Sequence, residues 1–209
     1  MTIQRQILRR FALLVVPAFL VTQAFTQTIS SVRTRWNDSF VEWEIYTTML
    51  RDSSDVSPEH QEESEAPDEE PGGELKQRWR NIRDDWSEWD YQIGDEQGTI
   101  KVKWKDEPSQ WELRSYDGHI ITMRTSWPKD YTEWRVTDNS VSLTLRSKWK
   151  NQLDEWLVDD SAHGRFYMYT LRTQDPRDWA VEDNLDESVS QAMKTAMIFL
   201  TVFNGSPRF

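Results

Sequence analysis

The chain contains no cysteine, and this absence excludes several classes of chemistry. Disulfide bonds, thiol nucleophiles, thiolate metal centres and lipid attachment through cysteine are impossible. Histidine is nearly as scarce, with three residues in 209, and glycine numbers only seven. We find no glycine-rich phosphate loop, no nucleophile elbow, no HExxH motif and no EF-hand loop. The sequence therefore predicts no cofactor, no metal site and no catalytic residue.

The three histidines are placed too far apart to act together. His60 lies in an acidic segment, and His119 and His163 lie in two predicted hairpin turns, two repeat units apart. At 4.8 Å per strand, hairpin neighbours are about 10 Å apart, so these two imidazoles should lie about 20 Å from each other. Ligands of one metal ion lie only about 2 Å from it. We interpret both histidines as turn residues.

Positive charge is also limited, with 25 Lys and Arg against 36 Asp and Glu. Ten of the acids lie between Asp52 and Glu74, a stretch without Lys or Arg, so one segment carries almost all of the net charge of −11. Proline, glycine and acid together predict a disordered, solvated insertion over 52–74. The functional alternative is an acidic arm that binds a basic partner or loosely gathers calcium. Binding to nucleic acid is not expected of such a chain.

Residues 1–26 have the pattern of an export signal. Arg5, Arg9 and Arg10 precede an uncharged apolar run over 11–21, and small or polar residues follow around Ala24. This layout is typical of a secretory signal peptide, and the alternative is an uncleaved N-terminal anchor. The apolar run is short for a membrane span, which favours cleavage. The signal pattern predicts an exported chain. Because such a chain without disulfides fits a bacterial envelope best, we expect a periplasmic, cell-surface or secreted bacterial protein.

Tryptophan, by contrast, is abundant, with twelve residues. Six of them recur at steps of 46, 22, 23, 22 and 23 residues: Trp43, Trp89, Trp111, Trp134, Trp156 and Trp179. A fixed period of this size indicates a repeat architecture. An aliphatic residue or tyrosine follows each tryptophan two positions later, and turn-forming residues come next. Alternation followed by a turn predicts one β-hairpin per repeat.

A second column of tryptophans precedes the first by seven positions. It consists of Trp36, Trp104, Trp127 and Trp149, with Ile82 and Arg172 in the equivalent places. A bulky or rigid residue lies four positions into each link: Phe40, Trp86, Pro108, Tyr131, Leu153 and Pro176. Only Trp79 and Trp86 lie outside the two columns. The hairpin period resembles that of MORN repeats, but their glycine pattern is missing, so the resemblance implies no function or site.

These patterns predict one all-β domain over 27–205, an antiparallel meander of tryptophan-anchored hairpins with one apolar face. Apolar residues at helical spacing predict an amphipathic helix over 185–203, capped by Asn184 and Glu187 and packed on the tryptophan face. That helix would be about 30 Å long, whereas a flat sheet of a dozen strands is nearly twice as wide. Either the sheet curls into a barrel-like form, or part of the tryptophan face stays open. Arg78 and Arg80 replace apolar or small residues of the other units, which predicts an irregular edge there.

Without a convergent polar site, the leading hypothesis is a non-enzymatic binding or structural protein of the bacterial envelope. The alternatives are a small barrel that carries an apolar ligand, with the helix as its lid, and a glycan-binding protein or glycan hydrolase. The acids before each first-column tryptophan are interpreted as partners of strand Lys and Arg rather than as a catalytic pair. If the tryptophan face is exposed, a protein or a glycan is expected to bind on it. The candidate ligand-binding residues are Trp104, Trp111, Trp127, Trp134, Trp149 and Trp156.

Overall fold

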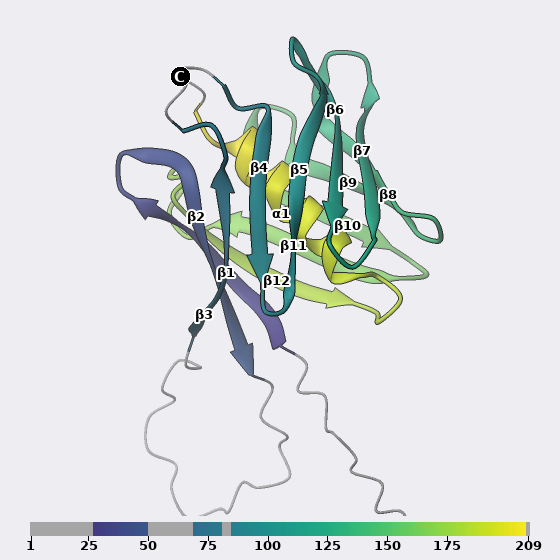
Figure 1. Cartoon of the computed structure of the whole chain (residues 1–209), viewed down its shortest axis with the longest axis horizontal. Helices are drawn as coiled ribbons and strands as arrows, with labels where there is room; N and C mark the ends of the chain where they lie inside the picture. Colours follow the sequence, from purple (N-terminus) through teal and green to yellow (C-terminus); the bar gives the residue numbers. More distant parts are fainter. Residues whose placement is uncertain (1–26, 50–68, 81–84, 208–209) are drawn as a thin grey trace, which may run out of the picture.

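The computed structural model describes residues 27–49, 69–80 and 85–207, which form a closed β-barrel around one α-helix (Figure 1). The strands are β1 (Gln27–Trp36), β2 (Ser39–Met49), β3 (Glu70–Gln77), β4 (Glu88–Ile93), β5 (Glu96–Trp104), β6 (Glu107–Ser115), β7 (Ile120–Trp127), β8 (Asp130–Thr137), β9 (Ser142–Trp149), β10 (Gln152–Asp160), β11 (Gly164–Thr170) and β12 (Asp178–Leu185). Each strand pairs antiparallel with its neighbours in sequence, and β1 pairs with β12 to close the sheet. The predicted all-β antiparallel meander is confirmed, in the barrel-like form.

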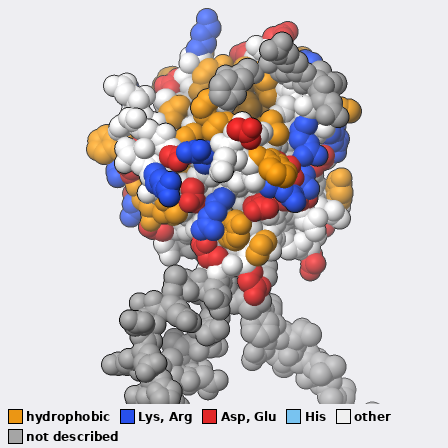
Figure 2. Space-filling model, turned by 90° about the vertical axis from the view of Figure 1, so that its left-hand side faces the viewer, with side chains coloured by type: hydrophobic (Ala, Val, Ile, Leu, Met, Phe, Trp, Pro, Cys, Tyr) orange, Lys and Arg blue, Asp and Glu red, His pale blue; other side chains and the backbone are white. Residues whose placement is uncertain are grey.

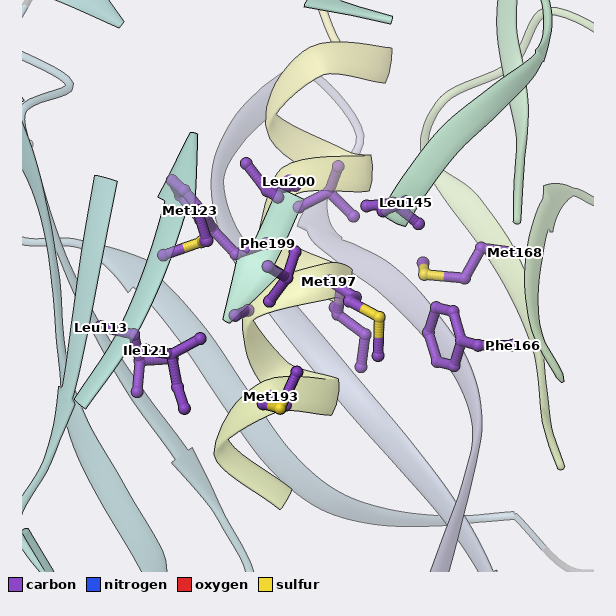
Figure 3. Packing of buried hydrophobic residues seen from close by; sticks show 14 of the residues in the cluster. Leu113, Ile121, Met123, Leu145, Phe166, Met168, Met193, Met197, Phe199 and Leu200 are labelled. Atoms are coloured by element: carbon purple, nitrogen blue, oxygen red, sulfur yellow. The ribbon is translucent and has the colours of Figure 1, made fainter. Parts of the chain in front are cut away.

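The helix α1 (Gln191–Gly205) runs through the interior of the barrel (Figure 1). Every residue from Thr195 to Asn204 is buried, so the helix is enclosed on all sides. Figure 3 shows Met193, Met197 and Leu200 among apolar side chains of the surrounding strands. Closing the sheet places all strands around a single helix, which explains how one helix covers the whole apolar face. The predicted packing of a C-terminal helix on the tryptophan face is therefore confirmed.

The helix begins later than its sequence pattern predicts. Asn184 and Leu185 still belong to β12, where they pair with β11. The N-cap is Ser190, whose Oγ accepts a hydrogen bond of 3.3 Å from the backbone N–H of Met193. The capping box predicted at Asn184 and Glu187 is wrong, because sheet pairing continues through Leu185 and a short turn follows before the helix.

Most of the predicted acidic insertion, over 52–68, lies outside the described residues, as does the predicted export signal over 1–26. Disorder over 52–74 is wrong for the last residues of that range, because β3 begins at Glu70 and pairs with both β2 and β4. Gly73 is required there by close packing: a Cβ on it would lie 2.4 Å from the carbonyl oxygen of Gln92. Glycine in this segment allows two strands to approach and is no sign of flexibility.

Arg78 and Arg80 lie in a turn just after β3, which ends at Gln77, and 81–84 lie outside the described residues, so the irregular edge predicted there stays a prediction. The guanidinium group of Arg78 binds the carboxylates of Glu88 and Asp90, and the Nε–Oδ2 distance to Asp90 is 3.0 Å. Arg80 Nη1 lies 2.8 Å from Glu42 Oε2. Both arginines therefore connect the turn after β3 to the neighbouring strands β4 and β2 through ion pairs.

Candidate binding surface at the tryptophan rim

The first-column tryptophans are core residues with one repeated hydrogen bond. Each indole Nε1–H donates to the carbonyl oxygen three residues earlier, at distances from 2.8 to 3.1 Å. The acceptors belong to the bulky or rigid link residues: Phe40, Trp86, Pro108, Tyr131, Leu153 and Pro176. All six indoles are at most 4% exposed. Each buried indole N–H group therefore has its hydrogen-bond acceptor within the preceding link. Because the acceptor is the backbone carbonyl oxygen of the link residue, the side chain of that residue can vary.

Two of these buried indoles pack edge-on against phenylalanines of the helix. The ring centroid of Trp111 lies 4.8 Å from that of Phe199 and 4.7 Å from that of Phe203, both edge-on. Trp89 contacts the same two phenylalanines, at 5.7 and 6.4 Å. Of the six candidate ligand-binding residues, Trp111, Trp134 and Trp156 are fully buried in this core.

The second-column tryptophans lie at one end of the barrel and are exposed. Because alternate strands of an antiparallel meander run in the same direction, the odd-numbered strands all end on this side. The exposed fractions are 55% for Trp36, 42% for Trp79, 60% for Trp104, 64% for Trp127 and 50% for Trp149. We call these five residues the tryptophan rim. Leu171, just after β11, is 52% exposed, so each odd strand ends in a large exposed apolar side chain or is followed by one within two residues.

Three rim indoles are held in place by carboxylates. Each carboxylate belongs to the acid directly before a buried tryptophan. The hydrogen bonds run from Trp36 Nε1 to Glu42 Oε2 (3.3 Å), from Trp79 Nε1 to Glu88 Oε2 (3.2 Å) and from Trp149 Nε1 to Glu155 Oε1 (3.1 Å). Trp79 therefore takes the rim position of its unit, which spacing had assigned to Ile82. The two tryptophans of this unit are ten positions apart instead of seven, and the signal that recurs is the acid–tryptophan pair that follows the link.

Cations hold the same carboxylates charged. Burial of the Glu42 carboxyl acts to raise its pKa, but hydrogen bonds from Trp36 and Arg35, at 2.9 Å for Arg35, outweigh burial and lower the pKa. The pKa of Glu155 is lowered mainly by Lys148, whose Nζ lies 2.5 Å from Oε2. The interpretation of these acids as ion-pair partners of strand Lys and Arg is confirmed at these positions.

The rim carries cations as well as aromatic rings. The side-chain cations of Arg35, Lys103 and Lys148 lie over the rings of the tryptophans that follow them, 5.5 to 5.9 Å from the ring centroids. Every rim tryptophan has Lys or Arg within two positions in sequence: Arg35, Arg78, Arg80, Lys103, Lys105, Lys129, Lys148 and Lys150. Figure 2 shows one side of the molecule, where hydrophobic, cationic and acidic side chains are intermixed. Acids lie in the same turns, among them Asp38, Asp106, Glu107 and Asp130, so the rim offers exposed indoles with single cations beside them and no net positive charge.

The opposite end of the barrel carries acids in its turns. Asp138 Oδ1 accepts hydrogen bonds from the backbone N–H groups of Ser140 and Val141, and Asp160 Oδ1 accepts those of Ala162 and His163. These acids shape the turns, as their sequence positions suggest. Within the described ranges, no group of three or more His, Asp or Glu side chains could hold a metal ion. We call this end, with Asp95, Asp117, Asp138, Asp160 and Asp186, the acidic end.

A cavity of about 430 Å³ opens beside the C-terminus of α1, at the same end as the rim. Its lining is made of amide, hydroxyl, proline, glycine and leucine residues and one carboxylate: Asn151, Gln152, Leu153, Asp154, Thr170, Gln174, Pro176, Asn204, Gly205, Ser206 and Pro207. Among these residues no histidine and no second acid faces Asp154. The lining therefore contains no pair of groups for general acid–base catalysis.

The class of protein defined here is an antiparallel barrel filled by its own C-terminal helix, with an aromatic rim that carries cations on the outside. Among the candidate residues, the structure brings Trp104, Trp127 and Trp149 together on that rim. Searches against protein-family models, curated proteins and solved structures found no match. In the part of the chain that is described, no helix is long and apolar enough to cross a membrane.

Proposed function

We propose that this chain is an exported, non-enzymatic binding module of the bacterial envelope, which binds an anionic lipid surface through its tryptophan rim. The observation that supports the proposal best is the repeated rim unit, in which an exposed indole is flanked by Lys or Arg. Export rests on the sequence pattern of residues 1–26. A non-enzymatic role is supported by the cavity, whose lining has no catalytic pair.

The interior of the barrel argues against the carrier alternative. In a carrier, the ligand would occupy the place that α1 fills. The residues Met193, Met197 and Phe199 are fully buried there, against strands from all around the barrel. A ligand would have to displace the helix and expose this core. Binding on the outer rim needs no such rearrangement.

The composition of the rim favours a lipid surface. Tryptophan is enriched at the interface of lipid bilayers, because its large apolar ring carries one polar N–H group. Lys and Arg beside such residues gain about 1 kcal/mol each near an anionic leaflet. All rim residues lie at one end of the barrel, so a flat surface can contact them at the same time. The acidic end lies on the far side and is repelled by the same surface, which orients the barrel.

Co-sedimentation with lipid vesicles tests this proposal. We expect the full chain to bind vesicles that contain phosphatidylglycerol and to bind pure phosphatidylcholine at least tenfold more weakly. The triple variant Trp104→Ala, Trp127→Ala, Trp149→Ala should lose most of the binding to anionic vesicles. A double variant at the acidic end, Tyr116→Ala with Ile120→Ala, is the matched control, since these side chains are 66% and 43% exposed. Equal binding by both variants would contradict the proposal.

A glycan is the second candidate, because of the spacing of the rim. Tryptophans on alternate strands lie about 10 Å apart at 4.8 Å per strand. That spacing is close to the length of a disaccharide unit in a β-1,4-linked chain, and indole faces stack on sugar rings. In that case the triple tryptophan variant should not bind an insoluble polysaccharide, whereas the unchanged protein should still bind it at high salt. Binding to a lipid surface should instead weaken as salt screens the cations.

A further inference from the structure

We infer that the acidic segment over 52–68 of a second copy of this chain binds the tryptophan rim, so that the protein associates head to tail. The inference rests on the part of the proposed function that makes the rim an anion-binding surface. It adds a second anionic partner, which would compete with the lipid surface for the same residues. The partner is supplied by the chain itself and regulates access to the rim.

The first argument is charge complementarity. Residues 52–68 contain seven acids and no Lys or Arg: Asp52, Asp55, Glu59, Glu62, Glu63, Glu65 and Asp68. At the rim end, Lys103, Lys150 and Arg172 are exposed, and among the described residues no ion pair is formed by them. The exposed acids Asp38, Asp106 and Glu107 lie at the same end, so the complementarity is local and consists of contacts between these three cations and carboxylates of a partner. The exposed indoles between them can pack against the apolar and proline residues of the same segment.

The second argument is the place where the segment joins the barrel. It connects β2 to β3, and Met49 at the end of β2 pairs with Gln27, at the acidic end. The rim lies at the other end of the same strands, where Trp36 pairs with Ser39. The segment therefore leaves the barrel on the side opposite to the rim. On a neighbouring copy stacked along the barrel axis, this side would face the rim directly.

Chain length favours a neighbouring copy over the segment's own barrel. Strand β2 has eleven residues, a path of about 36 Å at 3.3 Å per residue. A strand tilt of about 40° reduces this path to about 28 Å along the barrel axis. A loop over 50–68 that runs out and returns reaches at most about 32 Å when both arms are fully extended. Contact with its own rim would therefore require nearly complete stretching, at a high cost in chain entropy. A second copy needs no stretching, because its rim can approach the segment.

Head-to-tail contact joins two different surfaces, so the association is open-ended rather than limited to a dimer. A short charged segment forms a small interface, which makes the association weak and sensitive to salt. The proposal therefore expects monomers in dilute solution or high salt and a gradual rise in mass with concentration at low salt. Vesicles with anionic lipid should reverse that rise by occupying the rim.

A synthetic peptide of residues 52–68 tests the rim directly. Its addition to a dilute solution of the full chain should change the tryptophan fluorescence, and a control peptide with Asn and Gln in place of all Asp and Glu should not. The variant Lys103→Gln, Lys150→Gln, Arg172→Gln should bind the peptide at least tenfold more weakly. The wall variant Arg124→Gln, Arg135→Gln, Arg146→Gln removes the same charge from the exposed side of the barrel and should bind normally. Equal affinity of the two variants, or no binding at all, would overturn the inference.

Sedimentation velocity of the full chain tests association, with a chain lacking residues 52–68 as the comparison. We expect the mass to rise with concentration at low salt only when the segment is present. A full chain that stays monomeric up to millimolar concentration would refute the head-to-tail contact. If vesicles bind and the peptide does not, this inference fails alone. If the peptide binds the rim and vesicles do not, the lipid proposal fails alone.

Discussion

Lys194 and Asp183 connect the helix to the barrel wall. The ammonium Nζ of Lys194, in the first turn of α1, lies 2.7 Å from Oδ2 of Asp183 on β12. The two side chains are 17% and 6% exposed. Since Asp183 lies close to the point where the chain turns into the lumen, this ion pair fixes the direction in which the helix enters.

The first prediction concerns this pair. Asp183→Asn should lower the free energy of unfolding by about 3 kcal/mol, because it leaves a mostly buried ammonium group without its countercharge. The double variant Asp183→Leu with Lys194→Met should recover a large part of the loss, since both charges are removed together. Urea unfolding of the two variants measures the difference. A change below about 0.5 kcal/mol for Asp183→Asn would show that water replaces the partner.

The second prediction separates the two tryptophan columns. Trp134 is fully buried and its Nε1 donates to the carbonyl oxygen of Tyr131 at 2.9 Å, whereas Trp127 is 64% exposed. Trp134→Phe should therefore cost about 2 kcal/mol, from lost volume and an unsatisfied carbonyl. Trp127→Phe should change stability by less than about 0.5 kcal/mol. Equal effects in thermal or urea unfolding would argue against the assignment of the columns to the inside and the outside.

The third prediction concerns the end of the helix. A Cβ on Gly205 would lie 2.7 Å from Cζ2 of Trp179 and 3.0 Å from the carbonyl oxygen of Leu153. Gly205→Ala should therefore destabilise the fold by about 1–3 kcal/mol, because indole and backbone must both move. Ser206→Ala is the neighbouring control and should be nearly neutral, since Ser206 Oγ makes no hydrogen bond within the described chain. A neutral Gly205→Ala would mean that the helix end shifts freely.

The fourth prediction concerns pH. Glu42, Glu88 and Glu155 all have a lowered pKa in the fold: burial opposes the shift at Glu42 and Glu88, and hydrogen bonds and nearby cations outweigh it. A carboxyl with a lowered folded pKa stabilises the fold above its unfolded pKa of about 4.3, and this stabilisation is lost as pH falls through the folded value. The free energy of unfolding should thus decrease below about pH 4.3. Glu42→Gln should lower stability at pH 7 and flatten the acid dependence. A slope unchanged by this substitution would contradict the assignment.

The fold could largely be predicted, because the period of 22 or 23 residues repeats one hairpin with little variation. The width of the sheet against the length of one helix already required either closure or an open face. What the sequence could not decide was closure itself, which depends on the pairing of Ser31, Val32 and Arg33 with β12, across nearly the whole chain. The start of the helix was also missed, since Asn184 and Glu187 match a capping pattern but Asn184 still pairs in the sheet.

The candidate surface could be predicted only in part. The alternation of inward and outward side chains along a strand does not continue through the links. The reason is a register shift between Thr125 and Trp127 and at equivalent places in other hairpins. That shift sends the second column outward, whereas the first column faces the core. Sequence reasoning therefore grouped buried and exposed tryptophans in one set. Trp79 was left out for another reason, the longer link before Trp89, and the carboxylate of Glu88 is what reveals its place.

The position of α1 after all twelve strands has a consequence for biosynthesis. The residues that fill the lumen, from Met193 to Phe203, are made only after every strand of the barrel. Before α1 is made, the twelve strands lack the helix that fills the barrel, and inner tryptophans such as Trp89 and Trp111 lack their packing contacts with it. Folding of the barrel must therefore be completed after α1 has been made, and a product that stops short of residue 191 would lack the centre of its own core.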